Sequence, residues 1–259
     1  MRGILFLAIF LGCSGLGFAQ ETLLRKLDRP DEAQLWAAVG RVNIGNSGFC
    51  TGAVIEPQLV LTAAHCFYDR DSGRRVDTST VRFLAGWNHG TAQSVRSARR
   101  VLIDPEYVHG NDENSARISH DLALIELDQP VTSNIRPFDR YYAPQIGDVV
   151  SVVSYAQDRS EVPSIQEACT ILNKDVDVLV LTCAVNFGAS GSPIFVTTNA
   201  RPKIASVVSA MALLHGERVA LAVALDGTLD SLIEQLRHIN PVFVSRKPGA
   251  TLAEQLGRE

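Results

Sequence analysis

The sequence has no excess of positive charge. Lys and Arg number 24 against 28 Asp and Glu, and the formal net charge is −4. This balance gives no electrostatic reason to expect a nucleic-acid partner or an anionic membrane surface. Metal-binding motifs are missing too, because the six histidines form no His-x-x-x-His pair and the cysteines have no paired spacing. The glycines form no phosphate-binding loop, so we expect neither a metal nor a cofactor.

Long apolar runs are also absent, apart from one short run at the N-terminus. Arg2 precedes an apolar stretch over Ile4–Leu11, and the small residues Gly17 and Ala19 follow. This order is typical of a secretory signal peptide over residues 1–19, and the run is too short for a membrane anchor. The sequence thus predicts a secreted or periplasmic protein with no stable membrane insertion after signal removal.

Cysteine is scarce, with five residues in the chain. Cleavage of the signal removes Cys13 and leaves Cys50, Cys66, Cys169 and Cys183. An even number in an exported protein indicates two disulfides. Of the three pairings, Cys50–Cys66 with Cys169–Cys183 closes two short loops, each stabilising the fold by about 3 kcal/mol in a loop-closure model. Four buried free thiols are the alternative.

Short apolar runs rich in Val, Ile and Leu fill most of the mature chain, and turn-forming residues separate them. Such a succession without intervening helices is typical of a β-barrel or a β-sandwich. The main helical periodicity lies at Asp226–Ile239, and residues 246–259 are expected to form a loosely attached tail. The predicted strands are Ala37–Asn43, Cys50–Glu56, Leu59–Ala63, Val81–Trp87, Arg99–Asp104, Leu122–Leu127, Val149–Tyr155, Val178–Leu181, Pro193–Val196, Ile204–Ala210 and Val219–Leu225.

A histidine ends one of these runs, in the string LVLTAAHC over residues 59–66. A lone histidine is more often a structural residue, but here Cys66 offers a covalent link to the preceding strand. A general base must be held within hydrogen-bond reach of its nucleophile, which a rigid strand end does. His65 is therefore the candidate general base.

An aspartate opens another apolar run, in HDLALIEL over residues 120–127. A buried carboxylate can hold an imidazole in one tautomer and stabilise the imidazolium. Asp121 is the candidate for this role. Asp104 and Asp112 are the alternatives, although no apolar run directly follows either of them.

A serine between glycines precedes a third run, in FGASGSPIF over residues 187–195. A tight turn of this kind points backbone N–H groups at a reacting carbonyl. Ser190 is the candidate nucleophile, and the N–H groups of Gly188 and Ser190 are the candidate oxyanion hole. The Gly-x-Ser-x-Gly pattern of α/β-hydrolases is absent, because Gly191 follows the serine directly. A turn without catalytic role is the alternative.

The three segments, in the order His, Asp, Ser, resemble the chymotrypsin-like serine endopeptidases, and the TAAHC string is close to diagnostic of that family. The resemblance implies an all-β fold of two packed six-stranded antiparallel β-barrels, followed here by the predicted C-terminal helix. It covers residues 35–240 approximately, with the first barrel at 35–135 and the second at 145–240 of a peptidase domain spanning 20–245. The family's disulfide beside the histidine corresponds to Cys50–Cys66.

Within the family, Ala189 stands where the animal digestive enzymes carry an acidic residue that pairs with a newly cut N-terminus. That activation mechanism cannot operate without the carboxylate. The form Gly-x-Ser-Gly-Ser-Pro, the lead-in around Trp36 and Cys183 ahead of the serine instead resemble the bacterial branch that includes the glutamyl endopeptidases. The resemblance therefore implies a bacterial exported protein.

The resemblance also assigns a specificity pocket. Ala184 occupies the position that selects charge in trypsin-like relatives, Ser209 would hold the substrate backbone, and Met211 would stand at the pocket wall. Val208 replaces the histidine of the glutamate-selective relatives. Because an uncharged pocket cannot compensate a buried charge, we expect a small or apolar residue before the scissile bond.

Two functions fit this pattern. One is an active, monomeric endopeptidase that forms an acyl-enzyme with a polypeptide substrate. The other is a catalytically silent binding or regulatory protein on the same fold. The presence of all three catalytic residue types favours the enzyme.

Overall fold

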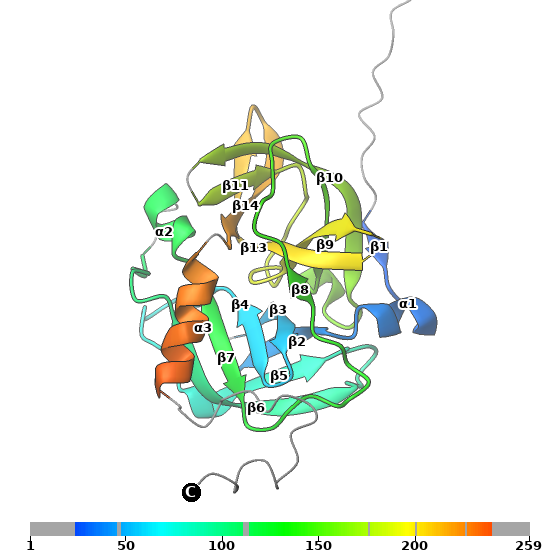
Figure 1. The fold of residues 1–259 in the computed structure, drawn as a ribbon, viewed down its shortest axis with the longest axis vertical. Helices are drawn as coiled ribbons and strands as arrows, with labels where there is room; N and C mark the ends of the chain where they lie inside the picture. The colour runs from blue at the N-terminus through cyan, green and yellow to red at the C-terminus, as the bar shows by residue number, and fades with distance from the viewer. Residues whose placement is uncertain are drawn as a thin grey trace, which may run out of the picture.

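Figure 1 shows the computed structural model, which describes residues 24–45, 48–110, 114–175, 177–199, 201–225 and 227–239. The predicted signal peptide, residues 1–19, and the predicted tail, residues 246–259, lie outside these residues, as does Asp112. Strands dominate the described chain and form two closed sheets.

The first barrel closes in the strand order β2-β3-β4-β7-β6-β5. Every residue of β4 and β7 is buried, because these strands are rich in Leu, Val and Ile and lie in the interior of the molecule. The strands are β2 (Val39–Ile44), β3 (Phe49–Glu56), β4 (Leu59–Thr62), β5 (Val81–Ala85), β6 (Ser94–Ile103) and β7 (Ala123–Leu127).

The second barrel follows the order β10-β11-β14-β13-β12-β9, and pairing of β9 with β10 closes it. Two short strands extend this sheet: β1 (Arg25–Lys26) pairs with β10, and β8 (Asp139–Arg140) runs parallel to β13. The barrel strands are β9 (Val149–Ser154), β10 (Ser164–Asp175), β11 (Val178–Leu181), β12 (Pro193–Thr198), β13 (Arg201–Leu214) and β14 (Glu217–Ala224).

Helices are few in the described chain. α1 (Pro30–Leu35) and α2 (Ser115–Ser119) are short, whereas α3 (Thr228–Ile239) buries an apolar face and lies along the first barrel, where it contacts β6 (Figure 1). Short 3₁₀ turns occur at Ala64–Phe67, Thr78–Thr80 and Gln157–Arg159. None of the helices in the described part of the chain combines the length and apolarity needed to cross a bilayer.

The predicted all-β fold of two six-stranded barrels with a C-terminal helix is confirmed. Every predicted strand overlaps an observed one. β10 is absent from the sequence prediction because polar residues interrupt its apolar positions, and a bulge around Ala168, whose φ is 58°, shifts its register.

The structure contains the two short-loop disulfides. Cys50–Cys66 joins β3 to the turn after β4, and Cys169–Cys183 joins β10 to the segment after β11. Each barrel is therefore cross-linked once by these bonds, in both cases close to a segment that carries a candidate catalytic residue.

Candidate active site

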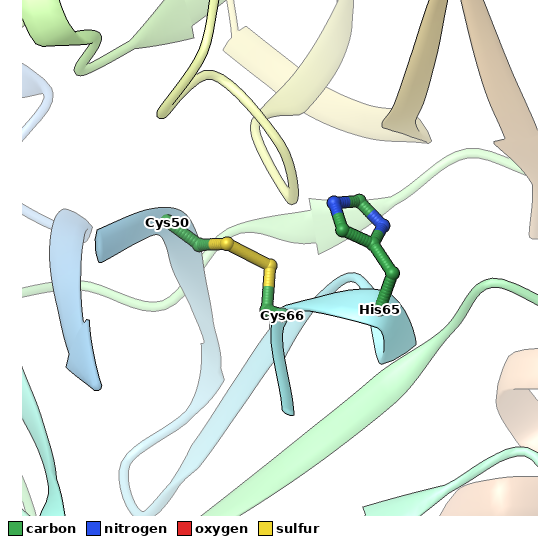
Figure 2. Close-up of side chains that lie close together, drawn as sticks. All are labelled: Cys50, His65 and Cys66. Carbon is green, nitrogen blue, oxygen red and sulfur yellow. A yellow bond between two sulfur atoms is a disulfide. The ribbon is translucent and has the colours of Figure 1, made fainter. Parts of the chain in front are cut away.

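His65 lies in the 3₁₀ turn that directly follows β4. The Cys50–Cys66 disulfide ties this turn to β3, and Figure 2 shows the imidazole projecting beyond the two sulfur atoms. The side chain of His65 is 21% exposed. The turn is thus fixed by a buried strand on one side and a covalent bond on the other, while one edge of the ring stays accessible.

Asp121 immediately precedes Leu122 and β7, and its side chain is fully buried. β4 pairs with β7 through Thr62 and Ala123, a register that brings His65 and Asp121 to the same end of the sheet. One carboxylate oxygen, Oδ1, accepts a hydrogen bond of 2.8 Å from the backbone N–H of His65. The other, Oδ2, lies 2.6 Å from Nδ1 of the imidazole.

The hydroxyl of Ser209, on β13 of the second barrel, donates a hydrogen bond to the same Oδ2 atom. Burial, the largest single effect, raises the pKa of Asp121, but the charge of His65 and the hydrogen bonds from His65 and Ser209 outweigh it and leave the pKa below its usual value. The carboxylate is therefore ionised at neutral pH. It accepts a hydrogen bond from Nδ1–H of His65, which leaves the lone pair on Nε2 free to act as a base.

Asp104, the alternative to Asp121, belongs to a different pair. Its carboxylate lies 3.1 Å from Nδ1 of His120 and accepts a hydrogen bond of 2.9 Å from the backbone N–H of Glu106. Neither of these contacts involves His65. The structure thus brings Asp121, and not Asp104, to the candidate base.

Ser190 lies in a turn that two glycines make possible. Gly188 has a φ of 94° and Gly191 a φ of 78°, which disfavours any residue with a Cβ atom. A Cβ atom at Gly191 would also lie 2.1 Å from Oγ1 of Thr62 and 2.3 Å from the carbonyl oxygen of Thr51. Among the described residues, no hydrogen bond joins Ser190 Oγ to His65, although both residues line the same cleft. Such contacts often tighten only when substrate binds.

The two candidate oxyanion-hole groups are the backbone N–H groups of Gly188 and Ser190. Within the described part of the chain, neither donates a hydrogen bond to a protein acceptor. Ala189 between them is fully buried in an apolar cluster with Cys183 and Val185. An acidic residue at this position would be desolvated in that cluster.

The cleft has a volume of about 850 Å³ and is lined by residues of both barrels. Among the described lining residues, those from the strands and the serine turn of the second barrel are uncharged: Val185, Asn186, Phe187, Ser190, Val208, Ser209, Ala210 and Met211. The loops between first-barrel strands contribute ionisable side chains, among them Asp69, Arg70, Asp71 and His109. Arg117 also lines the cleft, from α2, which lies against β11 and β14 of the second barrel. The strands and the serine turn of the second barrel thus line the cleft with uncharged side chains, and the segments around them carry the charged ones.

The structure places the predicted pocket residues unevenly. Ser209 and Met211 line the cleft, whereas Ala184 is exposed and is not among the described lining residues. That Ser209 holds the substrate backbone stays a prediction; the structure adds that its hydroxyl is bound to Asp121. That contact joins residues 88 positions apart, so no local sequence signal could have identified it.

Potential metal ligands of Cys50, His65 and Cys66 lie within 4.8 Å of one another (Figure 2). The two sulfur atoms are, however, bonded to each other. Cysteine binds metals as the thiolate, so this group does not fit a metal ion while the disulfide is intact.

Known proteins resemble the chain in both sequence and fold. The family model described as Trypsin matches residues 28–216. The glutamyl endopeptidase of Bacillus licheniformis is 29% identical over 166 residues, which cover 62% of this chain and 49% of that protein. The modular serine protease of Drosophila melanogaster is 32% identical over 125 residues, 45% of this chain and 18% of that protein. The chain thus spans about half the length of the first relative and less of the second.

Solved structures show the same fold at lower identity. A Glu endopeptidase in complex with MPD has a TM-score of 0.64 at 19% identity, covering 78% of this chain and 91% of that one. The thermostable serine protease AL20 from an extremophilic microorganism has a TM-score of 0.64 at 18% identity, covering 80% of this chain and 100% of that one. The match to the family model covers more than half of this chain, and the chain therefore belongs to the trypsin family.

Proposed function

We propose that this chain is a secreted serine endopeptidase. Ser190 attacks the carbonyl carbon of a peptide bond while Nε2 of His65 takes the hydroxyl proton. His65 then returns that proton to the leaving amine, and water hydrolyses the acyl-enzyme. The N–H groups of Gly188 and Ser190 stabilise the negative oxygen that develops on the carbonyl.

The observation that carries this proposal is the environment of Asp121. Burying an ionised carboxylate is unfavourable unless hydrogen bonds compensate it. Here the compensating side-chain donors are His65 and Ser209, and both residues line the cleft that also contains Ser190. The buried carboxylate of Asp121 thus orients a histidine in the cleft that contains the candidate nucleophile.

The proposed pocket is uncharged and accepts a small or apolar residue before the scissile bond. The support is the second-barrel wall, where Val185, Val208 and Met211 line the cleft together with the serine and the described strand and turn residues are uncharged. One relative is named a glutamyl endopeptidase. The arginines that line the described cleft, Arg70 and Arg117, lie on a loop and on α2, and neither belongs to the strands and the serine turn that form this wall. The wall itself offers a glutamate no positive charge.

Export is part of the proposal. The disulfides Cys50–Cys66 and Cys169–Cys183 are bonds that persist in oxidising compartments, and the N-terminal sequence is typical of a secretory signal. The mature enzyme would begin after Ala19. It would need no trypsin-like N-terminal cut for activity, because Ala189 has no carboxylate to pair with a new amine.

Labelling with a fluorophosphonate probe tests the catalytic proposal. The oxidised mature protein should be labelled on Ser190, Ser190→Ala should not be labelled, and His65→Ala should react far more slowly because the hydroxyl is not activated. Absence of labelling on the folded wild type would overturn the proposal in favour of a silent binding protein.

Cleavage of a mixed peptide library tests the pocket separately. Cleavage after small or apolar residues is expected. A preference for Glu, Lys or Arg before the scissile bond, in an enzyme that does label on Ser190, would contradict the uncharged pocket and leave the catalytic assignment intact.

A further inference from the structure

The turn that carries the candidate oxyanion hole has each of its carbonyl groups bound by a protein donor. The carbonyl of Phe187 accepts from the N–H of Gln157 at 2.8 Å, and that of Ala189 accepts from the N–H of Ser192 at 3.0 Å. In a trans peptide the carbonyl and the following N–H point in opposite directions. Fixing these two carbonyls therefore fixes the directions of the N–H groups of Gly188 and Ser190.

The remaining two carbonyls of the turn are bound by one residue of the first barrel, Thr51. Its backbone N–H donates to Ser190 O at 2.9 Å, and its hydroxyl donates to Gly188 O at 3.0 Å. The carbonyl of Tyr155 is a second acceptor for the same hydroxyl, at the longer distance of 3.3 Å. The hydroxyl also accepts a hydrogen bond of 3.0 Å from the N–H of Tyr155. Among the donors to these four carbonyls, the Thr51 hydroxyl is the one that comes from a side chain.

Thr51 is held as firmly as the turn that it binds. It is fully buried on β3, next to the disulfide-bonded Cys50. Its own carbonyl accepts a hydrogen bond of 2.8 Å from Oγ1 of Thr62. The hydroxyl is thus fixed on a barrel strand. Its acceptor belongs to Gly188, whose φ of 94° is a conformation that glycine adopts readily among several others, so the turn depends on its hydrogen bonds.

We propose that the Thr51 hydroxyl is a positioning residue for the oxyanion hole, and that it supplies the restraint which the buried, apolar Ala189 cannot supply. The proposal rests on the function proposed above. Without the hydroxyl, the carbonyl of Gly188 loses its partner in a buried setting, and an unpaired buried carbonyl favours rotation of its peptide. The N–H of that peptide, on Ala189, still donates to the carbonyl of Asn186 at 2.9 Å, so loss of the hydroxyl leaves the peptide held on one side. Its rotation would shift the neighbouring peptides, which carry the N–H groups of Gly188 and Ser190.

Three variants test this inference. Thr51→Val keeps the shape of the side chain and removes the hydroxyl, so kcat should fall by about 10- to 100-fold with little change in KM, because the oxyanion forms only in the transition state. Thr51→Ser keeps the hydroxyl and should retain most of the activity. Ser206→Ala, which removes another buried hydroxyl donating to a carbonyl, that of Val223, is the matched control and should leave kcat close to wild type.

Affinity for a peptide aldehyde, which forms a tetrahedral adduct with serine peptidases, separates positioning from a merely structural role. It should weaken in Thr51→Val by the same factor as kcat/KM. If the valine variant does not fold, Thr51→Ala removes the same hydroxyl without adding volume. Wild-type kcat and aldehyde affinity in a folded variant lacking the hydroxyl would overturn the inference. Failure of the wild type to label with fluorophosphonate would instead overturn the proposed function.

Discussion

The two barrels hold their candidate catalytic groups in different ways. In the first barrel, His65 and Asp121 lie at the adjoining ends of β4 and β7, two paired strands whose residues are all buried. In the second, Ser190 lies in an irregular segment between β11 and β12. Strand pairing fixes the positions of His65 and Asp121 relative to each other, whereas the position of Ser190 depends on individual hydrogen bonds to its turn.

Several hydrogen bonds at the cleft join one barrel to the other. Thr51 of the first barrel binds the carbonyls of Gly188 and Ser190, and Ser209 of the second binds the carboxylate of Asp121. Each barrel thus fixes a polar group of the other at the cleft. The site is assembled by the interface between the barrels, and neither barrel alone completes it.

The largest effect is expected inside the first barrel. Asp121→Asn should lower kcat by about 10⁴-fold, because an asparagine no longer holds His65 in the basic tautomer. Ser209→Ala removes the contact from the second barrel and should lower kcat by about 10-fold, since the loss of one hydrogen bond to a charged group leaves the others in place. Steady-state kinetics on a chromogenic peptide provide both values.

Asp104→Asn is the matched control for this comparison, because Asp104 is also buried and also paired with a histidine, His120. Its kcat should stay within a few fold of wild type. An equal loss in Asp104→Asn and Asp121→Asn would contradict the assignment of the orienting carboxylate to Asp121.

A smaller but still large effect is expected at the turn of the second barrel. Gly191→Ala adds a Cβ atom 2.1 Å from Oγ1 of Thr62, which must displace the turn, so kcat/KM should fall by about 100- to 1000-fold. Gly90→Ala, with a comparable φ of 82° and nothing within 4 Å of the added atom, should lose only about 1 kcal/mol of stability.

Kinetics and urea unfolding of both glycine variants show whether crowding, and not backbone conformation, is decisive. If Gly191→Ala retained wild-type activity, the serine would be less dependent on its turn than the difference between the barrels implies.

The sequence predicts most strands well because both barrels consist of apolar runs separated by turn residues. The arrangement of these strands in two barrels follows from the family resemblance, since the runs alone fit a barrel or a sandwich. β10 escapes prediction because its burial alternates irregularly around the bulge at Ala168. α2 escapes because five residues carry too little periodicity. In both elements tertiary contacts, and not a local pattern, determine the conformation.

The residues of the candidate site also differ in whether a local sequence pattern identifies them. His65 and Ser190 lie in short strings whose residue types carry the prediction, and Asp121 follows from its place before an apolar strand. The hydroxyl contacts of Thr51 and Ser209 link residues 137 and 88 positions apart. Serine and threonine are common in strands and turns, so nothing local marks these two until the barrels are packed together.

The smallest expected effect concerns the pH dependence of stability. Burial is the largest single effect on the pKa of Asp121 and raises it. The interactions with His65 and Ser209 together outweigh burial, so the pKa lies below the usual 3.8. A carboxyl with a lowered folded-state pKa stabilises the fold fully above its unfolded pKa and loses that contribution as the pH falls through the folded-state pKa. The free energy of unfolding should therefore decrease below about pH 3.8, and less steeply in Asp121→Asn.

Asp69 provides the comparison within the same barrel. Hydrogen bonds from Ser72 lower its pKa also, but it lies in a surface loop where water screens such interactions. Asp69→Asn should therefore change the acid slope less than Asp121→Asn does. Urea unfolding between about pH 2 and pH 5 measures these slopes. An unchanged slope in Asp121→Asn would mean that the hydrogen bonds to its carboxylate do not stabilise the fold, and that their contribution is confined to orienting the histidine.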